Sequence, residues 1–503
     1  MGARTKPCHL PAAQFSWDNQ KADQRRPPSH FPVKRYETFA AEIADSIRGG
    51  LLRSGDRLPS VRQASSSRGV SPSTVFQAYY LLEAQGLIRA RERSGYFVAG
   101  GGTAQLPEPE PAVPQPTASL ELDISARISE VLGASMTRDM VPFGSAFPGP
   151  ELFPVARLAR AMATAVQRLD PWAMVDDLGP GSARLRRQVA LRYLVDGLHV
   201  PAEDIVITNG ALEALNLCLQ AVAKLGDAVL VESPTFYAAL QSLERLGLRA
   251  VEVPTHPRDG VSVEAVAAAI AQHRPAACWL MTNFQNPMGG LVPDARKQAL
   301  VELLGRHGIP LVEDDVYGEL YFGERRPAPA KAFDTRGLVL HCSSFSKCLA
   351  PGYRIGWAAP GRFTQAVTRL KLATSLATCV PAQAALATYL EEGGYDRHLR
   401  KLRLQLALQQ ARFVDAVSRH FPPGTRATRP AGGYFLWVEL PPGADALAIH
   451  RQALSLGISV APGPIFSASR GFQNCLRLNY GHVWNDAADA ALRTLGKLVA
   501  SYT

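Results

Sequence analysis

The chain has 503 residues, too many for one hydrophobic core, so we expect at least two domains. Its hydrophobic fraction (47%) and charged fraction (19%) exclude a largely disordered chain. It contains no continuous apolar run of about eighteen residues, so no membrane span is predicted. The net charge of +10 is uneven: residues 1–98 carry 15 basic and 8 acidic side chains, whereas residues 99–140 carry 2 and 6. A basic N-terminal region favours a polyanionic partner.

Seven cysteines are spread through the chain without a CxxC pair. An odd and dispersed set argues against a disulfide framework or a zinc site, so we predict no metal centre and a reducing, cytoplasmic compartment. The N-terminus also lacks the apolar stretch of a secretory signal. Cys348, which follows Lys347, is expected to be a small packing residue rather than a nucleophile.

Composition divides the chain into four segments. Residues 1–32 are polar and have no apolar periodicity, so we predict a mobile tail. Residues 33–101 have the helical patterning of a small domain. Residues 102–138 begin with glycines and alternate proline with glutamate, which predicts an extended linker. In residues 139–503, short apolar runs alternate with helical stretches, which predicts an α/β domain whose largely parallel sheet is covered on both faces.

The small domain contains three predicted helices and a hairpin. Apolar residues at three- and four-residue spacing predict helices at 36–48 and at 72–85, and Ser60 can cap a short helix between them at 61–69. Ser71 and Pro72 suit the start of the third helix, and Gly86 suits its end. The stretch "LIRARERSGYFVA" predicts two strands that turn at Ser94 and Gly95. These elements together predict a winged helix-turn-helix, mostly α with a β-hairpin wing.

The stretches "GDRLPSVR", "GVSPSTV" and "GLIRARERSGYFV" closely resemble the GntR family of bacterial transcription factors. The resemblance implies a double-stranded DNA partner, with Arg57 and Arg62 at phosphates and the wing in contact through Arg93 and Gly95. Many family members have polar residues where this chain has Pro72 and Phe76, so base readout would rest on Gln77 and Ser73. The residues expected to face the major groove are Ser71, Ser73, Thr74 and Gln77.

Five stretches of the large domain suit one ligand. "TNGALEALNL" (208–217) follows a predicted strand and opens a helix, whose free amides suit a phosphate. "ESPTFYAAL" (232–240) places Phe236 and Tyr237 where a ring could stack on a planar ligand, although for either ring taken singly core packing is the more common role. "NFQNPMGG" (283–290) supplies Asn286, and "EDDVYGEL" (313–320) supplies Asp314 and Tyr317. Both follow strands, and ligands of open α/β sheets bind at the carboxyl ends of strands.

The fifth stretch, "SSFSKCLAPGYR" (343–354), carries Lys347. Its amine can form a Schiff base with an aldehyde once its pKa is lowered. Ser344, Ser346 and Arg354 beside it can bind a phosphate. A buried carboxylate such as Asp314 needs a cationic partner, and a protonated pyridine nitrogen would serve.

In this order the five stretches resemble the fold type I pyridoxal phosphate enzymes, the aspartate aminotransferase-like superfamily, over about residues 140–500. The resemblance implies an α/β domain with a small α+β subdomain, and pyridoxal 5'-phosphate as cofactor. Lys347 would carry the cofactor as a Schiff base, Asp314 would pair with its ring nitrogen, and Arg477 in "NCLRLNYG" would grip a substrate carboxylate. The other expected cofactor-binding residues are Ala211, Leu212, Phe236 (with Tyr237 as the alternative), Asn286, Tyr317, Ser344, Ser346 and Arg354.

A GntR-type DNA-binding domain (residues 33–101, called the reader below) joined to an aminotransferase-like domain resembles the MocR subfamily of regulators. That resemblance implies a transcriptional regulator that senses pyridoxal phosphate, an amino acid or an amine. It also implies a homodimer that places two readers on paired operator half-sites. Two alternatives remain open: an active aminotransferase that carries a DNA-binding domain, and a DNA-binding scaffold without cofactor. Whether the chain is an enzyme is left open, since every catalytic position of the resemblance is filled.

Overall fold

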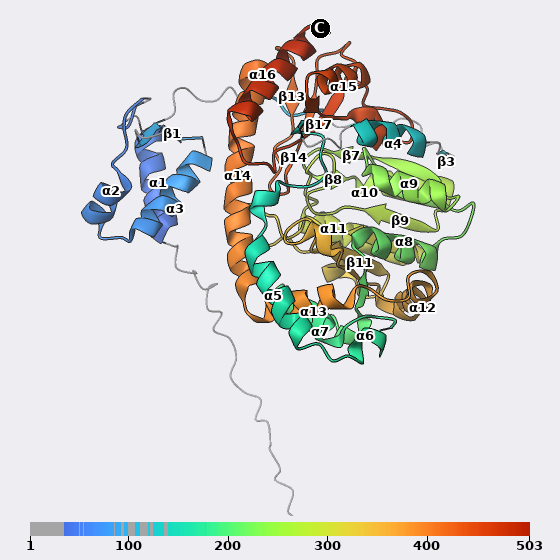
Figure 1. Cartoon of the computed structure of the whole chain (residues 1–503). Helices are drawn as coiled ribbons and strands as arrows, with labels where there is room; N and C mark the ends of the chain where they lie inside the picture. Colours follow the sequence, from blue (N-terminus) through green and yellow to red (C-terminus); the bar gives the residue numbers. More distant parts are fainter. Residues whose placement is uncertain are drawn as a thin grey trace, which may run out of the picture.

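The computed structural model describes residues 35–49, 51–53, 55–84, 86–91, 95–98, 106–110, 119–120, 124–134, 139–176 and 178–502. The expected tail at 1–32 lies outside these residues. A small N-terminal domain lies beside a larger α/β body (Figure 1). The small domain consists of α1 (Arg35–Arg48), α2 (Val61–Arg68), α3 (Pro72–Ala84), β1 (Ile88–Arg91) and β2 (Gly95–Val98).

Local caps determine the helix boundaries of the small domain. Ser60 and Gln63 form a reciprocal capping box at the start of α2, and Gly69 ends that helix in the left-handed conformation. The hydroxyl of Ser71 accepts the backbone N–H of Thr74 at the start of α3, as expected for its cap. One face of α3 packs on α1, and β1 pairs antiparallel with β2. The predicted winged helix-turn-helix is therefore confirmed.

The large domain is built on a mixed sheet with strand order β3-β7-β6-β9-β10-β11-β12-β5, to which β8 adds beside β7. Strands β7, β6, β9, β10 and β11 are parallel, and β12, β5, β3 and β8 are antiparallel to their neighbours. The bounds are β3 (Ser119–Leu120), β5 (Val206–Thr208), β6 (Ala228–Ser233), β7 (Arg249–His256), β8 (Gly260–Val261), β9 (Ala277–Leu280), β10 (Leu311–Asp314), β11 (Val339–Ser344) and β12 (Gly356–Ala359).

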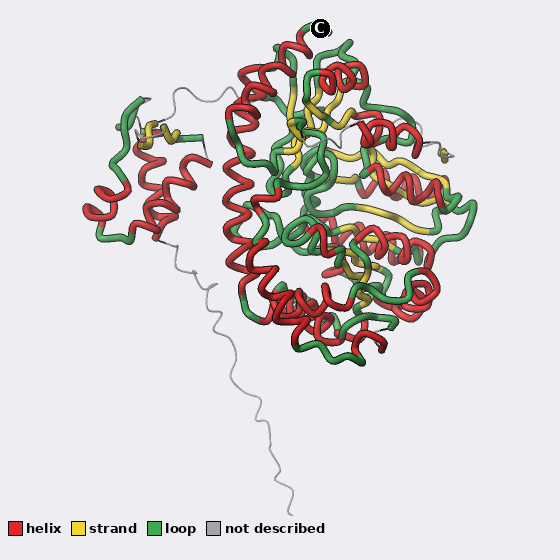
Figure 2. The backbone as a smooth tube through the Cα atoms, viewed as in Figure 1, coloured by secondary structure: helices red, strands yellow, loops and turns green. Residues whose placement is uncertain are grey.

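Helices cover both faces of this sheet, as the near-continuous apolar strands require (Figure 2). Separate apolar clusters include residues of α8 and α9 on one face and of α10 and α11 on the other. The helices of the large layer are α4 (Ser125–Ala134), α5 (Val155–Gln167), α6 (Ala173–Asp176), α7 (Ala183–Val195), α8 (Ala211–Val222), α9 (Tyr237–Arg245), α10 (Val263–His273), α11 (Asp294–His307), α12 (Thr364–Thr374) and α13 (Val380–Glu391).

A small subdomain follows the long helix α14 (Gly394–His420), which connects it to the large layer. Its antiparallel sheet has the order β13-β14-β17-β16. A short parallel pair, β4 with β15, ties this subdomain to the segment between β3 and β5 of the large sheet. The bounds are β4 (Val141–Pro142), β13 (Arg426–Ala427), β14 (Phe435–Glu439), α15 (Ala446–Ser455), β15 (Ile458–Ser459), β16 (Ala461–Pro462), β17 (Cys475–Asn479) and α16 (Asp486–Ala500).

The segment expected to be a linker, 102–138, is partly described and touches the large domain. Residues 106–110 lie against the start of the small sheet, where the N–H of Ala427 donates to the carbonyl of Pro107 (3.0 Å). Strand β3 pairs with the edge strand β7, and α4 packs against α9. The domain boundaries drawn from composition stay predictions.

Candidate cofactor and DNA-binding sites

Lys347 follows β11, at the end of the large sheet where the parallel strands finish. Its Nζ donates to the carbonyl of Ala146 (3.0 Å) and lies 3.8 Å from the centre of the Phe147 ring. Burial lowers the pKa of Lys347 to about 7, and the cations of Arg477 and Arg354 act in the same direction. A neutral amine is therefore available near neutral pH, which is what attack on an aldehyde requires.

Asp314 ends β10, the strand next to β11, and is 1% exposed. Burial raises the pKa of Asp314 to about 7, while the cation of Lys347 opposes that rise. Among the described residues, no group donates a hydrogen bond to Oδ1 of Asp314. A buried carboxyl oxygen without a partner is costly, so the site has room for a donor that the chain itself does not supply.

Arg477 lies on β17 of the small sheet and is fully buried. Its guanidinium donates to Oδ1 of Asn286 (3.2 Å) and to the carbonyl oxygens of Gly144 (2.5 Å) and Ser145 (3.2 Å). Burial lowers the pKa of Arg477 below its ordinary value. In the described chain, Nε of Arg477 and Nδ2 of Asn286 have no acceptor. A buried cation held by carbonyl oxygens suits a carboxylate ligand.

The expected phosphate-binding residues lie on the β11–β12 connection and at the start of α8. Arg354 donates to Oγ of Ser346 (3.4 Å) and to the carbonyl of Asn209 (3.4 Å). The N–H of Ser346 donates to Oγ of Ser344 (3.3 Å). Gly210 has φ of 82° and no side-chain cap for the helix behind it, and a Cβ there would collide with the Arg354 guanidinium. The first backbone amides of α8, those of Ala211 and Leu212, therefore follow a glycine packed against Arg354. That guanidinium also contacts the hydroxyl group beside Lys347.

Several aromatic side chains surround this edge of the sheet. Tyr317 is 1% exposed and lies edge-on to Tyr434, with ring centres 5.4 Å apart. Tyr237 contacts the ring of Phe466 and hydrogen-bonds the Arg477 side chain. Since Tyr237 is engaged in this way, the half-buried Phe236 is the better candidate to stack on a planar ligand.

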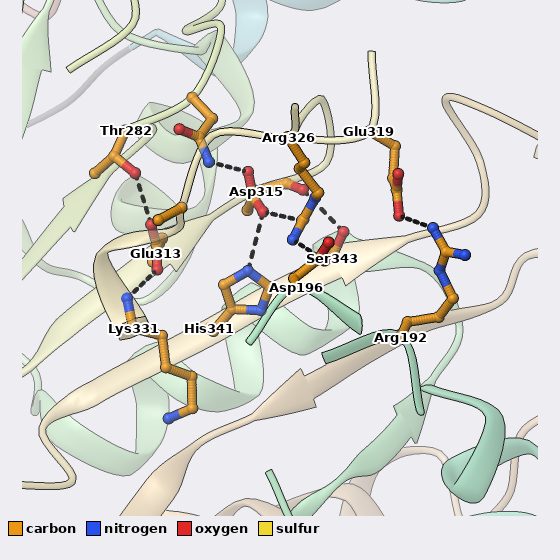
Figure 3. A network of polar contacts seen from close by, with 12 residues as sticks. Arg192, Asp196, Thr282, Glu313, Asp315, Glu319, Arg326, Lys331, His341 and Ser343 are labelled. Carbon is orange, nitrogen blue, oxygen red and sulfur yellow. Dashed lines mark hydrogen bonds and ion pairs between the residues drawn. The ribbon is translucent and has the colours of Figure 1, made fainter. Parts of the chain in front are cut away.

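Sequence reasoning missed a buried polar network behind the site (Figure 3). Asp315 accepts from Arg326 (2.7 Å), His341 (3.1 Å) and Asn283 (2.9 Å). Burial alone would raise the pKa of Asp315, but Arg326 and His341 lower it below its ordinary value. Arg326 also pairs with Asp196 (2.7 Å).

The other half of the network holds Glu313, which accepts from Thr282 (2.6 Å) and from the N–H of Lys331 (3.0 Å). Side chains alternate along a strand, so Glu313 and Asp315 point to one face and Asp314 points to the other. The network therefore fixes the strand end that presents Asp314. The run of three acidic residues in "VEDDV" was the available signal, because buried carboxylates need donors.

Of the residues expected to touch DNA, Arg57, Arg62, Ser71, Ser73 and Gln77 are exposed on the small domain, and Thr74 and Gly95 are half-buried. Ser71, Ser73 and Thr74 form a linked group of hydroxyls at the start of α3, with Oγ of Ser71 2.8 Å from the other two oxygens. Arg57, Arg62 and Gln77 are exposed nearby in the sequence. Gly95 begins β2 with φ of 99°, close to the Arg57 side chain, whereas Arg93 lies outside the described residues.

The opposite part of α3 is docked on α14 of the large domain (Figure 1). Arg412 pairs with the buried Glu83 (3.1 Å), and Asp415 pairs with Arg89 of β1 (3.2 Å). Gln405 donates to the hydroxyl of Tyr80 (2.9 Å). These polar contacts attach the C-terminal half of α3 and the adjacent strand β1 to the large domain. They leave the N-terminal half of α3 accessible.

Neither a metal site nor a membrane span is found in the part of the chain that the structure describes. No cluster of three or more His, Cys, Asp or Glu side chains there could hold a metal ion. No described helix is long and apolar enough to cross a bilayer.

Comparison with known proteins extends these observations to the whole chain. Residues 35–98 match the gntR family of bacterial regulatory proteins, and residues 179–495 match aminotransferase class I and II. The HTH-type transcriptional regulator YdcR of Escherichia coli (strain K12) is 44% identical over 93% of this chain and 99% of its own length. The 2-aminoadipate transaminase of Thermus thermophilus is 33% identical over 74% of this chain and 93% of its own length.

Solved structures agree with the fold. The α-aminoadipate aminotransferase LysN from Thermus thermophilus, complexed with N-(5'-phosphopyridoxyl)-L-leucine, has a TM-score of 0.68 and 30% identity. It covers 76% of this chain and 99% of its own. A multiple substrate aminotransferase from Thermococcus profundus has a TM-score of 0.69 and 27% identity, and it covers 75% and 95%. The chain therefore belongs to the MocR subfamily of GntR regulators, in which a winged helix-turn-helix domain is joined to an aminotransferase class I and II domain.

Proposed function

We propose that this protein is a DNA-binding transcriptional regulator whose large domain binds pyridoxal 5'-phosphate and senses an amino acid or amine. One observation carries the proposal. The chain combines a group of hydroxyls at the start of α3, and the exposed Arg57 and Arg62 before and within α2, with Lys347, an amine whose pKa is about 7, at the end of the large sheet. A ligand that binds the two states of a protein unequally shifts their populations, which is the physical requirement for a sensor.

The described side chains fit the cofactor. Lys347 would hold it covalently, and Asp314, whose Oδ1 has no donor in the described chain, would accept from its ring nitrogen. Asn286 has an unpaired Nδ2 that could donate to the ring's phenolic oxygen, as could Tyr317. Bound there, pyridoxal phosphate would supply an aldehyde that joins reversibly to amines. The residues that would hold its phosphate are Ser344, Ser346, Arg354 and the amides of Ala211 and Leu212.

The effector would carry a carboxylate. Arg477 is a buried cation whose partners in the described chain are all uncharged: the carbonyl oxygens of Gly144 and Ser145, the amide oxygen of Asn286 and the Tyr237 side chain. An amino acid that places its carboxylate on this guanidinium would replace those weaker acceptors. Arg477→Met should then weaken effector binding by roughly 30-fold while leaving cofactor binding nearly unchanged. Isothermal titration with cofactor and then with candidate amino acids measures both.

The regulator would act as a homodimer on paired operator half-sites. Several large apolar side chains on and beside α6 are exposed, among them Trp172 (69%), Val175 (64%) and Met174 (55%). A second copy of this chain is the partner we propose for that face, because a two-fold dimer presents two readers. We place it in the cytoplasm, where DNA is found and where the six described cysteines would stay free.

A visible spectrum of the purified protein tests the proposal. Added pyridoxal phosphate should give a coloured complex, and candidate amino compounds should change its absorbance and its affinity for operator DNA. Lys347→Ala should remove the colour and the ligand response. An unchanged ligand response of operator binding in Lys347→Ala would show that the large domain is not the sensor, and a colourless protein would favour the cofactor-free scaffold.

The second candidate function is a working aminotransferase that carries a DNA reader. The complete set of groups, Arg477 included, favours it, as does the similarity to a 2-aminoadipate transaminase. Multiple rapid turnovers with one amino acid and a keto acid acceptor would support an enzyme. A slow or absent reaction with intact cofactor binding would support a sensor.

A further inference from the structure

The acidic linker segment bridges the two sheets of the large domain. Glu108 pairs with Arg258, at the β7–β8 turn of the large sheet, and lies 3.9 Å from Nε of Arg429, just after β13 of the small sheet. The carbonyl of Leu106 accepts from Arg429 (2.8 Å). Residues 106–110, with Arg258, Ala427 and Arg429, are called the linker clamp below. The clamp therefore contacts the large sheet and the small sheet, and residues beside or on the same two sheets form the proposed ligand site.

Backbone pairing adds to these charges. Strand β13 is an edge strand of the small sheet, and its Ala427 N–H donates outward to the carbonyl of Pro107 (3.0 Å). A segment that pairs with an exposed edge in this way is held by main-chain bonds and oriented by side chains. Pro109 is buried, and the more exposed Glu110 pairs with Arg426 (3.0 Å). The linker is thus docked on a built surface, although its composition alone predicts an extended spacer.

The clamp lies directly behind the loop that carries Asn286. The carbonyl of Arg258 accepts the N–H of Leu291 (3.0 Å), five residues after Asn286. On the other side, Gly289 lies so close to Pro430 that an added Cβ would stand 2.5 Å from its ring. Asn286 itself accepts from Arg477 (3.2 Å). One packed loop therefore separates the guanidinium expected to bind the effector from the two arginines that hold the linker.

We propose that a ligand in the large domain strengthens the linker clamp. The effector would then set how many linker residues lie free between the DNA-binding domain and its first attachment to the large domain. This inference rests on the proposed function. A ligand that joins the cofactor to an amino acid would be held at its phosphate by Arg354, beside β12 of the large sheet, and at its carboxylate by Arg477 of the small sheet. It would therefore tie together the same two bodies as Glu108. When the ligand restricts the relative motion of the two sheets, formation of the linker clamp costs less conformational entropy. Ligand binding and clamp formation therefore favour each other.

The consequence for the reader follows from chain length. Val98, the end of the wing, and Leu106 are eight residues apart in the sequence, which limits their separation to about 28 Å with the clamp closed. With the clamp open, the next described pairing is β3 at Ser119, and the limit rises to roughly 70 Å. Once the contacts between the DNA-binding domain and α14 are released, the clamp would therefore restrict which half-site spacings the two DNA-binding domains of a dimer can reach.

Hydrogen exchange at the Ala427 amide tests the first half of the proposal, because its acceptor is the linker itself. The probe is N-(5'-phosphopyridoxyl)-L-leucine, which offers both a phosphate and a carboxylate to the full-length protein. We expect saturating probe to slow exchange at Ala427 roughly two- to fivefold, the range of a modest coupling. Binding of the probe with unchanged or faster exchange at Ala427 overturns the clamp and leaves the proposed function intact. Failure of the probe to bind overturns both.

Linkage supplies the second half. If ligand binding raises the equilibrium constant for closing the clamp, closing the clamp must raise the affinity for the ligand by the same factor. Glu108→Gln should speed exchange at Ala427 and weaken probe binding by a matching two- to fivefold, an order-of-magnitude expectation for an exposed ion pair. Glu110→Gln, which loses one more exposed pair, should have a smaller effect. Glu302→Gln, on the surface of α11, is the matched control and should change neither quantity. Equal probe affinity in Glu108→Gln and Glu302→Gln overturns the proposal.

Discussion

The DNA reader and the candidate cofactor site use side chains in opposite ways. In the reader, the expected functional residues lie within a short stretch, from Arg57 to Gly95, and the described ones are mostly exposed and set by local caps. In the large domain, the functional side chains come from positions as distant as Asn286 and Arg477, and they meet in a buried site that shifts the pKa values of Lys347 and Asp314. A surface that binds a polyanion needs accessible charge, whereas a site for reversible amine chemistry needs dry surroundings.

Replacing Lys347 tests the buried side of this comparison most severely. Lys347→Ala removes the amine that would join the cofactor, so the protein should lose all cofactor colour and bind pyridoxal phosphate at least ~100-fold more weakly. Absorbance and equilibrium dialysis measure the two effects. Lys401→Ala, on the exposed surface of α14, is a matched control and should keep both. Full colour in Lys347→Ala would move the attachment point to another amine.

Asp314→Asn should have the next largest effect. The variant keeps the shape of the side chain but removes the charge that would face the cofactor's ring nitrogen. Breaking one side of a buried charge pair costs about 3 kcal/mol, so cofactor affinity should fall on the order of 100-fold while the fold is retained. Calorimetric titration measures the affinity, and circular dichroism checks the fold. Wild-type affinity in Asp314→Asn would remove this residue from the proposed site.

The pH dependence of cofactor attachment follows from the lowered pKa of Lys347. The amine is neutral and reactive above its pKa and protonated below it, and that pKa is about 7 rather than the ordinary 10.5. Attachment should therefore speed up about tenfold from pH 5 to pH 6 and level off above pH 8. Stopped-flow absorbance at fixed cofactor concentration measures the rate. A rate that keeps rising to pH 10 would mean that the reacting amine is exposed and unperturbed.

The two regions also differ in how far sequence could predict them. Periodicity and caps were sufficient for the reader, because Ser60, Ser71 and Gly86 act on residues within one helical turn. In the large domain, the alternation of strands and helices predicted the parallel sheet, and motif order placed Asp314 and Lys347 at its carboxyl end.

Pairings between distant residues could not be found in the same way. The contacts of Asp315 with Arg326, His341 and Asn283 join residues that are far apart in the sequence. The contact of Glu108 with Arg258 does the same. Tertiary packing alone brings these side chains together. The charge on the linker was visible in the sequence, but nothing local to it indicated that a basic surface lay within reach.

Of the substitutions compared here, Arg62→Ala in the exposed DNA-binding domain has the smallest expected effect, and together with Gln77→Ala it separates two kinds of DNA contact. Arg62→Ala should weaken binding severalfold on every duplex and reduce the dependence of log affinity on log salt by about one, because one phosphate contact is lost. Gln77→Ala should instead cost about 1–3 kcal/mol on the operator only, since a base contact carries sequence information. Fluorescence anisotropy over a salt series, on operator and on scrambled DNA, measures both quantities.

These two outcomes test whether exposure alone makes a residue of the reader functional. Arg62 and Gln77 are both exposed, so burial does not distinguish them. Their chemistry does: a guanidinium neutralises a phosphate wherever the duplex presents one, whereas a carboxamide discriminates only where a matching base edge lies opposite. If Gln77→Ala lost affinity equally on operator and scrambled DNA, base readout would rest instead on Ser73, or on the sequence-dependent shape of the duplex. The reader would then resemble the large domain in one respect, with its specificity set by the arrangement of several groups rather than by one side chain.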